Sequence, residues 1–270
     1  MNACQSMLQS EKLNLIDREF GVSGPNHLSS GKRADIFTAL QSDIVRLQGL
    51  RSSSNSLLDS GLGPIKDSFP NASFPIGAVH EFISQATEDA SATSGFIAGL
   101  LSALMGSNGT VLWISSSRKL FPPALKTFGI DPERFIFIDL QKEKDVLWAM
   151  DEALKCSALS AVVGEMREIS FTNSRRLQLA VEQSQVTGFI LHNKHRNPNA
   201  TACVSRWKIT PLPGDRLGEL PGISFPKWRV ELLRIRNGKP GAWDIQWMKG
   251  KFTTVYKPEL GFTEPQKKAG

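Results

Sequence analysis

Short apolar runs alternate with helix-like segments through the middle of the chain. In the segments between the runs, apolar residues recur every three or four positions, as in amphipathic helices. The runs themselves are continuously apolar, so both faces of the sheet that they form should be covered by helices. The pattern predicts a doubly wound α/β domain of about five parallel strands. The expected strands are residues 77–83, 110–116, 135–140, 159–166 and 187–193; the expected helices are 91–105, 144–156 and 172–185, with a short helix at 121–129.

After Asn193 the helical pattern stops and strand-like segments follow. Apolar and polar residues alternate from Trp228, and the phase slips at Leu232-Leu233, which indicates a β-bulge. Asn237-Gly238 is typical of a turn between two strands. We therefore expect a terminal β extension in which most tryptophans face a core. Its expected strands are residues 203–210, 228–236 and 242–255.

The first part of the chain has a different character. Residues 34–50 place apolar side chains at helical spacing and predict an amphipathic helix. A Ser-, Gly- and Pro-rich stretch without periodicity follows and is typical of a linker. The expected division is an N-terminal segment with the helix at 1–51, the linker at 52–76, the α/β core at 77–200, a basic β extension of the core at 201–256 and a flexible tail at 257–270.

The formal net charge of +6 is concentrated near the end of the chain. Residues 1–204 carry 19 Lys and Arg and 20 Asp and Glu, whereas residues 205–270 carry 13 and 6. Concentrated positive charge attracts acidic partners and nucleic acids, which release counterions on binding. A solvated basic surface is the equally open alternative. The outward positions expected to contact a partner or DNA are Arg206, Lys208, Arg229, Arg234 and Arg236.

Composition disfavours membrane and secreted proteins. The longest apolar stretch, residues 96–105, is half of the roughly 20 residues that a membrane-spanning helix needs. The first residues lack the basic cluster and apolar run of a secretory signal. The three cysteines are odd in number and far apart, which suits a reducing compartment better than a disulfide framework. We therefore expect a cytoplasmic globular protein without membrane contact.

A parallel sheet of this kind is where nucleotide-binding proteins carry a phosphate loop after the first strand. Such a loop needs a glycine-rich turn, a lysine and a hydroxyl next to the lysine. The string GPNHLSSGKR at residues 24–33 has the wrong glycine spacing and has Arg33 in place of the hydroxyl. We interpret it as a chance match.

The proper place for the loop follows residues 77–83, and it lacks the required charge. No lysine or arginine occurs between Lys66 and Arg118, while Glu88 and Asp89 add negative charge where a triphosphate would bind. The sequence therefore predicts no bound nucleotide or other cofactor and no catalytic residue. The positions that remain of a nucleotide site are Ser94, Gly95 and Glu165.

Isolated polar residues give no complete site. Glu165 ends a predicted strand, where a phosphate-loop ATPase would hold magnesium, but we interpret it as a surface glutamate or an ion pair with Arg167 or Arg175. His192 and His195 lack a third metal ligand nearby and are expected to be loop histidines. The open alternative is a weak ATPase with an atypical site near Glu88, Arg118 and Glu165.

These segments resemble a known family, the bacterial ImuA proteins, which belong to the RecA-like group and are distantly similar to the cell-division inhibitor SulA. The resemblance covers about residues 77–250, and the combination of LWAMDEAL, RRLQLA and WRVELLR is specific. It is carried by the strings GAVHEF, FIAGLLSAL, VLWIS, FPPALKTFGIDPERFIFI, KDVLWAMDEALKCSALSAVVGEM, SRRLQLAVEQSQVTGFIL and WRVELLRIRNGKPGAWDIQW.

The resemblance implies a RecA-like core in a DNA-damage-inducible accessory protein. ImuA proteins act with ImuB, a catalytically inactive relative of the Y-family polymerases, and with a DnaE-type polymerase in error-prone synthesis past lesions. RecA is a further expected partner, and DNA is another through the basic C-terminal region. Because the loop lysine is missing, the resemblance implies a non-catalytic scaffold in which no residue carries over a catalytic role. A plain DNA-binding module is the remaining alternative.

Overall fold

The computed structural model describes residues 58, 61–116, 120–193, 199–214, 216–217, 220–221 and 225–255, which belong to one compact unit, residues 46–270. The helix expected at 34–50, the tail expected at 257–270, Arg118 and His195 lie outside these described residues.

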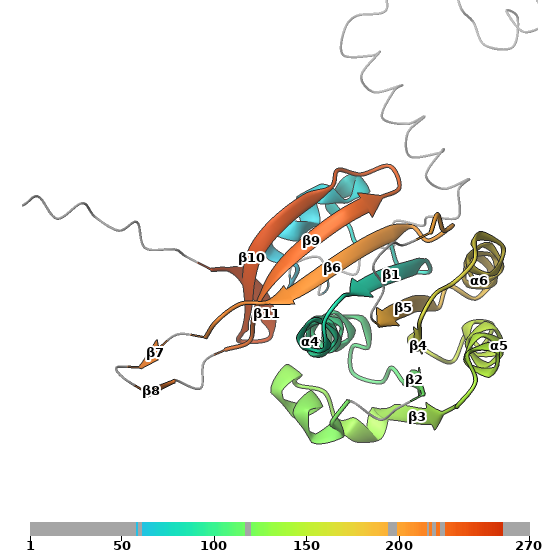
Figure 1. Cartoon of the computed structure of the whole chain (residues 1–270), viewed down its shortest axis with the longest axis horizontal. Coiled ribbons are helices and arrows are strands. Elements are labelled where there is room, and N and C mark those ends of the chain that lie inside the picture. The colour runs from blue at the N-terminus through green and yellow to red at the C-terminus, as the bar shows by residue number, and fades with distance from the viewer. Residues whose placement is uncertain are drawn as a thin grey trace, which may run out of the picture. The chain divides into compact units, whose positions relative to one another are not determined.

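The described residues form a large sheet with helices on both faces and a separate two-stranded ribbon (Figure 1). The strands are β1 (Val79–Ser84), β2 (Val111–Ser115), β3 (Phe135–Asp139), β4 (Ala161–Met166), β5 (Thr187–Asn193), β6 (Ser205–Pro211), β7 (Arg216–Leu217), β8 (Leu220–Pro221), β9 (Lys227–Ile235), β10 (Gly241–Met248) and β11 (Lys251–Thr254). The α-helices are α4 (Thr87–Leu104), α5 (Glu143–Leu154) and α6 (Phe171–Ser184), and the 3-10 helices are η1 (Gly63–Ser68), η2 (Pro70–Ala72), η3 (Pro122–Phe128) and η4 (Pro132–Arg134).

The nine strands of the large sheet follow the order β11-β10-β9-β6-β1-β5-β4-β2-β3. All pairs from β6 to β3 are parallel, and the pairs from β6 to β11 are antiparallel. The expected mostly parallel α/β sheet is confirmed, with β6 as a sixth parallel strand. This arrangement is compatible with a RecA-like fold.

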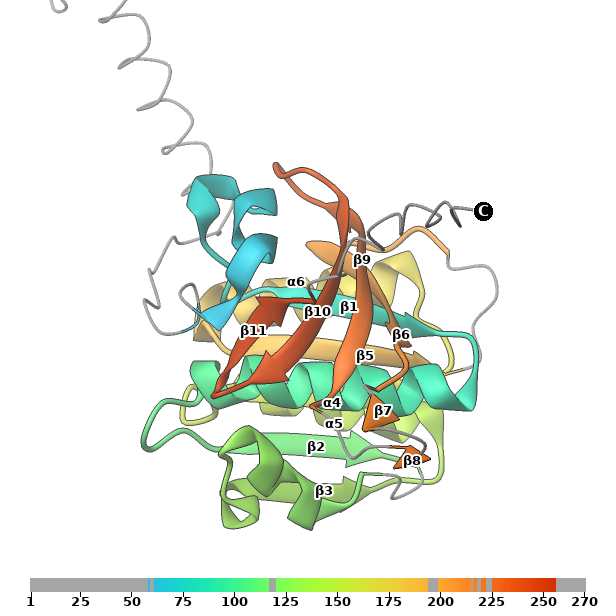
Figure 2. The same ribbon diagram turned by 90° about the vertical axis from the view of Figure 1, so that its left-hand side faces the viewer.

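Helices cover the two faces of the parallel part unequally. Val79 of β1 belongs to the core that Val146 of α5 and Leu177 of α6 share on one face. Phe82 points to the opposite face, because side chains alternate along a strand, and its ring lies 6.3 Å from that of Phe96 in α4. Among the described α-helices, α4 therefore lies on one face, next to the 3-10 helix η3, and α5 and α6 cover the other (Figures 1 and 2).

The β extension buries its aromatic side chains against α4. Phe96 of α4 contacts the rings of Trp207 and Trp228, and the Trp228 and Trp247 side chains are buried. The predicted bulge is confirmed by a register shift opposite Arg206 and Trp207. Since α4 loses its cover without these strands, β6, β9, β10 and β11 complete the core of the fold.

Two element boundaries differ from the expectation. Helix α4 begins at Thr87, four residues before the expected start at residue 91, because Asp89 stabilises its first turn. The expected strand 242–255 is a hairpin of two strands, since Lys249 and Gly250 both take positive φ angles, 53° and 74°.

Much of the segment 52–76, expected to be a linker, is folded. Phe69 and Phe74 form an edge-to-face pair with ring centroids 5.3 Å apart, and the ring of Phe69 lies 5.9 Å from that of Trp207. The linker interpretation is wrong for the described part, because spaced apolar residues anchor its 3-10 turns to the sheet. The buried apolar side chains of this segment are Leu58, Leu62, Ile65, Phe69 and Phe74.

Candidate functional site

A cavity of about 470 Å³ lies at the carboxyl ends of β4 and β5, between α4 and η3. In open α/β sheets, ligands bind at this edge. The cavity brings together all three positions that the sequence identified as remnants of a nucleotide site, Ser94, Gly95 and Glu165. Its lining is mostly apolar and, among the described residues, includes no lysine or arginine: Thr87, Ala90, Ser91, Ser94, Gly95, Ala98, Leu120, Phe121, Ala124, Leu125, Phe128, Glu165, Leu191 and Asn193.

The connection from β1 to α4 is too short to wrap a phosphate. Strand β1 ends at Ser84 and α4 begins at Thr87, so only two residues separate them, whereas the phosphate-loop motif spans eight. The side chain of Asp89 accepts hydrogen bonds from the backbone N–H groups of Gln85 and Ala86, at 3.2 and 3.0 Å. Unpaired N–H groups at a helix start are the donors that bind phosphate in nucleotide sites. Here the protein's own carboxylate binds the N–H groups of Ala86, the residue just before α4, and of Gln85, and it places a negative charge at that end of the helix.

Glu165 forms the polar floor of the cavity and is buried. One carboxylate oxygen accepts a hydrogen bond from the indole Nε1 of Trp113 at 2.9 Å, and the other from the Nδ2 of Asn193 at 3.4 Å. The expected surface position is therefore wrong, and Arg167 instead pairs with Glu143 at 3.7 Å. The strands on either side of β4, β2 and β5, supply these partners, which a single sequence could not identify without the strand register.

Ser94 and Gly95 have structural roles in α4. The hydroxyl of Ser94 donates to the carbonyl of Ala90 at 3.0 Å, one helical turn back. A Cβ on Gly95 would lie 3.3 Å from Cζ2 of Trp228 and 3.5 Å from Cζ of Phe128. The glycine therefore serves the close packing of α4 against β9.

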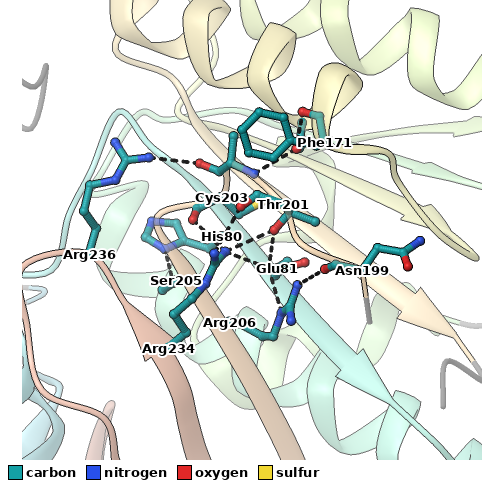
Figure 3. Close-up of polar contacts among 12 residues, drawn as sticks. His80, Glu81, Phe171, Asn199, Thr201, Cys203, Ser205, Arg206, Arg234 and Arg236 are labelled. Carbon is teal, nitrogen blue, oxygen red and sulfur yellow. Dashed lines mark hydrogen bonds and ion pairs between the residues drawn. The ribbon is translucent and has the colours of Figure 1, made fainter. Parts of the chain in front are cut away.

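A buried carboxylate cluster on the other face of the sheet was not expected from the sequence (Figure 3). Glu81 of β1 accepts hydrogen bonds from Arg206 Nε at 2.8 Å, Arg234 Nη2 at 3.2 Å and the Thr201 hydroxyl at 2.5 Å. Burial alone would raise the pKa of Glu81, but His192, Arg206 and Thr201 hold the pKa below its ordinary value. The cluster ties β1 to β6, β9 and the segment before β6.

Two of the residues predicted to contact a partner, Arg206 and Arg234, therefore bind Glu81 of the same chain. His192 also belongs to this region: it is buried in β5, with Nε2 3.6 Å from Glu81, so its interpretation as a loop histidine is wrong. The sequence signal for the cluster is a lone glutamate within the apolar run 77–83, since a carboxylate in a buried strand needs a cationic partner.

The remaining basic positions share the outer face of the β extension. Lys208 lies 3.7 Å from Glu231, and Arg229 binds Asp244 at 2.9 Å. Arg236 donates to the carbonyl of Ala202 at 3.1 Å. The expected common face is thus present, but each of these side chains has a partner within the molecule. Contact of this face with DNA or another protein stays a prediction.

Among the described residues no group of three or more His, Cys, Asp or Glu side chains is placed to hold a metal ion. Within the same ranges, no helix has both the length and the apolar character to cross a membrane.

Comparison with known proteins gives the family. No family model matches the chain. Two curated relatives are the ImuA proteins of two strains of Caulobacter vibrioides, each 33% identical over 202 residues, which cover 70% of this chain and 83% of the relative. Identity of this extent, over most of both chains, shows that the chain belongs to the ImuA family.

Proposed function

We propose that this protein is a non-catalytic accessory factor of damage-induced mutagenesis, in which it acts in the cytoplasm with an ImuB-type inactive Y-family polymerase and a DnaE-type polymerase. Membership in the ImuA family supports the pathway. RecA is a further proposed partner. In this role the protein contributes by binding other macromolecules, without turning over a nucleotide.

One observation carries the non-catalytic part of the proposal, the carboxylate of Asp89 on the N–H groups of Gln85 and Ala86. Phosphoryl transfer depends on backbone donors, a lysine and a magnesium ion that neutralise the charge of the phosphates. The Asp89 carboxylate at this end of α4 repels phosphate, and the two-residue connection leaves no loop to enclose it. Glu165 could supply only the magnesium side of such a site.

The proposal is tested by separating partner binding from ATP chemistry in the same protein. In cells that lack this protein, the unsubstituted chain and the Glu165→Gln variant should restore damage-induced mutation frequency to within about twofold of each other. The amide oxygen of Gln can still accept from Trp113, and its NH2 group can donate to Asn193 once the Asn193 amide turns to present its oxygen. Purified full-length chain should also bind the ImuB-type protein, with a Kd of about 1 μM or lower, which corresponds to about −8 kcal/mol. A Glu165→Gln variant that binds ImuB normally but loses mutagenesis would contradict the non-catalytic role.

DNA binding by the outer face of the β extension is a second candidate, favoured by the shared face of Arg229, Lys208 and Arg236. Glu231 and Asp244 lie on the same face and reduce its net charge. The affinity for a 20-nucleotide single strand should fall steeply with salt if several phosphates are neutralised. A flat salt dependence would count against this candidate.

A further inference from the structure

Helix α6 exposes apolar side chains beside a group of arginines. Phe171 and Leu179 are 57% and 47% exposed, and Arg175 lies between them, at four-residue spacing on one face of the helix. Most large apolar side chains of an amphipathic helix face the core, as Leu177 does here. The exposed stripe on α6 thus consists of two apolar side chains, Phe171 and Leu179, with the positively charged Arg175 between them.

A chain of hydrogen bonds joins this stripe to the end of β9. The Ser174 hydroxyl donates to the Phe171 carbonyl at 2.8 Å and accepts from the Ala202 N–H at 2.9 Å. The Ala202 carbonyl in turn accepts from Arg236 at 3.1 Å (Figure 3). Arg236 is thereby held beside α6, although the two segments are far apart in the sequence.

The arginines that meet here repel one another. Burial lowers the pKa of Arg236 from its ordinary range, the nearby carboxylate of Glu182 opposes this shift, and the positive charges of Arg175 and Arg234 add to it. The single negative charge of buried Glu81 is shared between Arg206 and Arg234, so it cannot fully neutralise the two positive charges. An added carboxylate at this place would relieve the repulsion.

We propose that Phe171, Arg175 and Leu179 of α6, with Arg236 just after β9, form a docking surface for an acidic, apolar-anchored segment of a partner protein. This α6–β9 surface deepens the proposed function and rests on it, because it names where the accessory protein binds its partner. Apolar anchors flanked by arginine are typical of protein interfaces. A nucleic acid fits less well, since Glu182 lies among the cations and would repel a continuous phosphate backbone.

Binding of the full-length chain to the ImuB-type protein tests the surface. Arg175→Glu and Leu179→Asp should each weaken binding by about tenfold or more, because they remove the complementary charge and an apolar anchor. Lys126→Glu makes the same charge change on exposed η3, which lies against α4 on the other face of the sheet; this control should change affinity by less than about twofold. Each variant is at an exposed position, and thermal unfolding checks that it is folded.

Each alternative outcome decides a different point. Normal binding of ImuB by both Arg175→Glu and Leu179→Asp would overturn the α6–β9 surface and leave the proposed function intact. If these variants instead weakened only binding to a 20-nucleotide single strand, or only self-association in sedimentation equilibrium, the surface would serve DNA or a second copy and the inference would be wrong. Failure of the unsubstituted chain to bind ImuB would contradict the proposed function and this inference with it.

Discussion

Phe252 of β11 lies so close to Gly99 of α4 that a Cβ on residue 99 would be 2.5 Å from Cζ of the ring. Cε3 of Trp247 would be only 3.2 Å from the same Cβ. The Phe252 ring cannot swing away freely, because it also packs against the rings of Phe96 and Trp228. Helix α4 approaches the antiparallel strands this closely because residue 99 has no side chain.

Gly99→Ala should therefore destabilise the protein, although alanine ordinarily favours a helix by about 1 kcal/mol over glycine. Overpacking of a well-packed core costs about 1–3 kcal/mol, so we expect a net loss of about 1–2 kcal/mol in the free energy of unfolding. Urea unfolding measures this loss. Gly61→Ala is the control, because a Cβ there meets nothing within 4 Å. Equal stability of the Gly99→Ala variant and the unsubstituted chain would contradict the close packing.

Removal of residues 205–270 should prevent folding. The truncation takes away Trp207, Trp228 and Phe252, which bury Phe96 of α4, and it leaves β1 without a parallel neighbour on one side. We expect the truncated chain to lose its near-ultraviolet circular dichroism and its cooperative thermal transition. A cooperative transition at the temperature of the full chain would show instead that the β extension is dispensable for the core.

Glu81→Gln should lower the free energy of unfolding by about 3 kcal/mol, since breaking a buried ion pair leaves its cationic partners uncompensated. The matched control is Glu231→Gln, which removes a pair with Lys208 at 3.7 Å in which both side chains are about a third exposed. That variant should cost less than about 1 kcal/mol. Guanidinium unfolding of both variants measures the difference, and equal costs would refute the structural role of the Glu81 cluster.

His80 should make the protein less stable in mild acid. Burial lowers the pKa of His80 from 6.5 to about 4, and its ring nitrogens lie 2.6 Å from the Ser205 hydroxyl and 2.8 Å from the Pro75 carbonyl. The unfolded chain takes up a proton below pH 6.5 while the folded chain does not, so stability falls as the pH drops from 6.5 towards 4. The full effect is about 3 kcal/mol, because each pKa unit corresponds to about 1.4 kcal/mol.

The pH dependence is checked by urea unfolding between pH 7 and 4. His80→Asn should be less stable at pH 7 but should lose less stability over this range than the unsubstituted chain. Parallel curves for the two proteins would show that the acid sensitivity arises from other groups.

The sequence pattern predicts the strands well where helices or strands cover both faces of the sheet, because such strands are continuously apolar. The strand expected at 187–193 is β5 with the same bounds, and the bulge at Leu232-Leu233 is present. The hairpin turn at Lys249-Gly250 was missed, since lysine seldom takes a positive φ and gives no turn signal. The folded part of 52–76 was missed because its apolar residues follow no regular period and are held by long-range contacts.

The site was predictable in its charge but not in its contacts. The acidic residues at the start of α4 were evident from the sequence, and Asp89 does bind the N–H groups there, whereas Glu88 is exposed. The partners of Glu165 and Glu81 could not be predicted, because each depends on which strands become neighbours. Sheet order, and not local pattern, decides which polar side chains meet.

Equilibrium titration of the full-length chain with Mg·ATP tests the central claim most directly. With the Asp89 carboxylate at the start of α4, we expect no saturable ATP binding below about 1 mM, a limit that corresponds to about −4 kcal/mol. The same preparation should bind the ImuB-type protein under these conditions. Saturable micromolar binding of ATP that disappears in a Glu165→Gln variant would contradict the account.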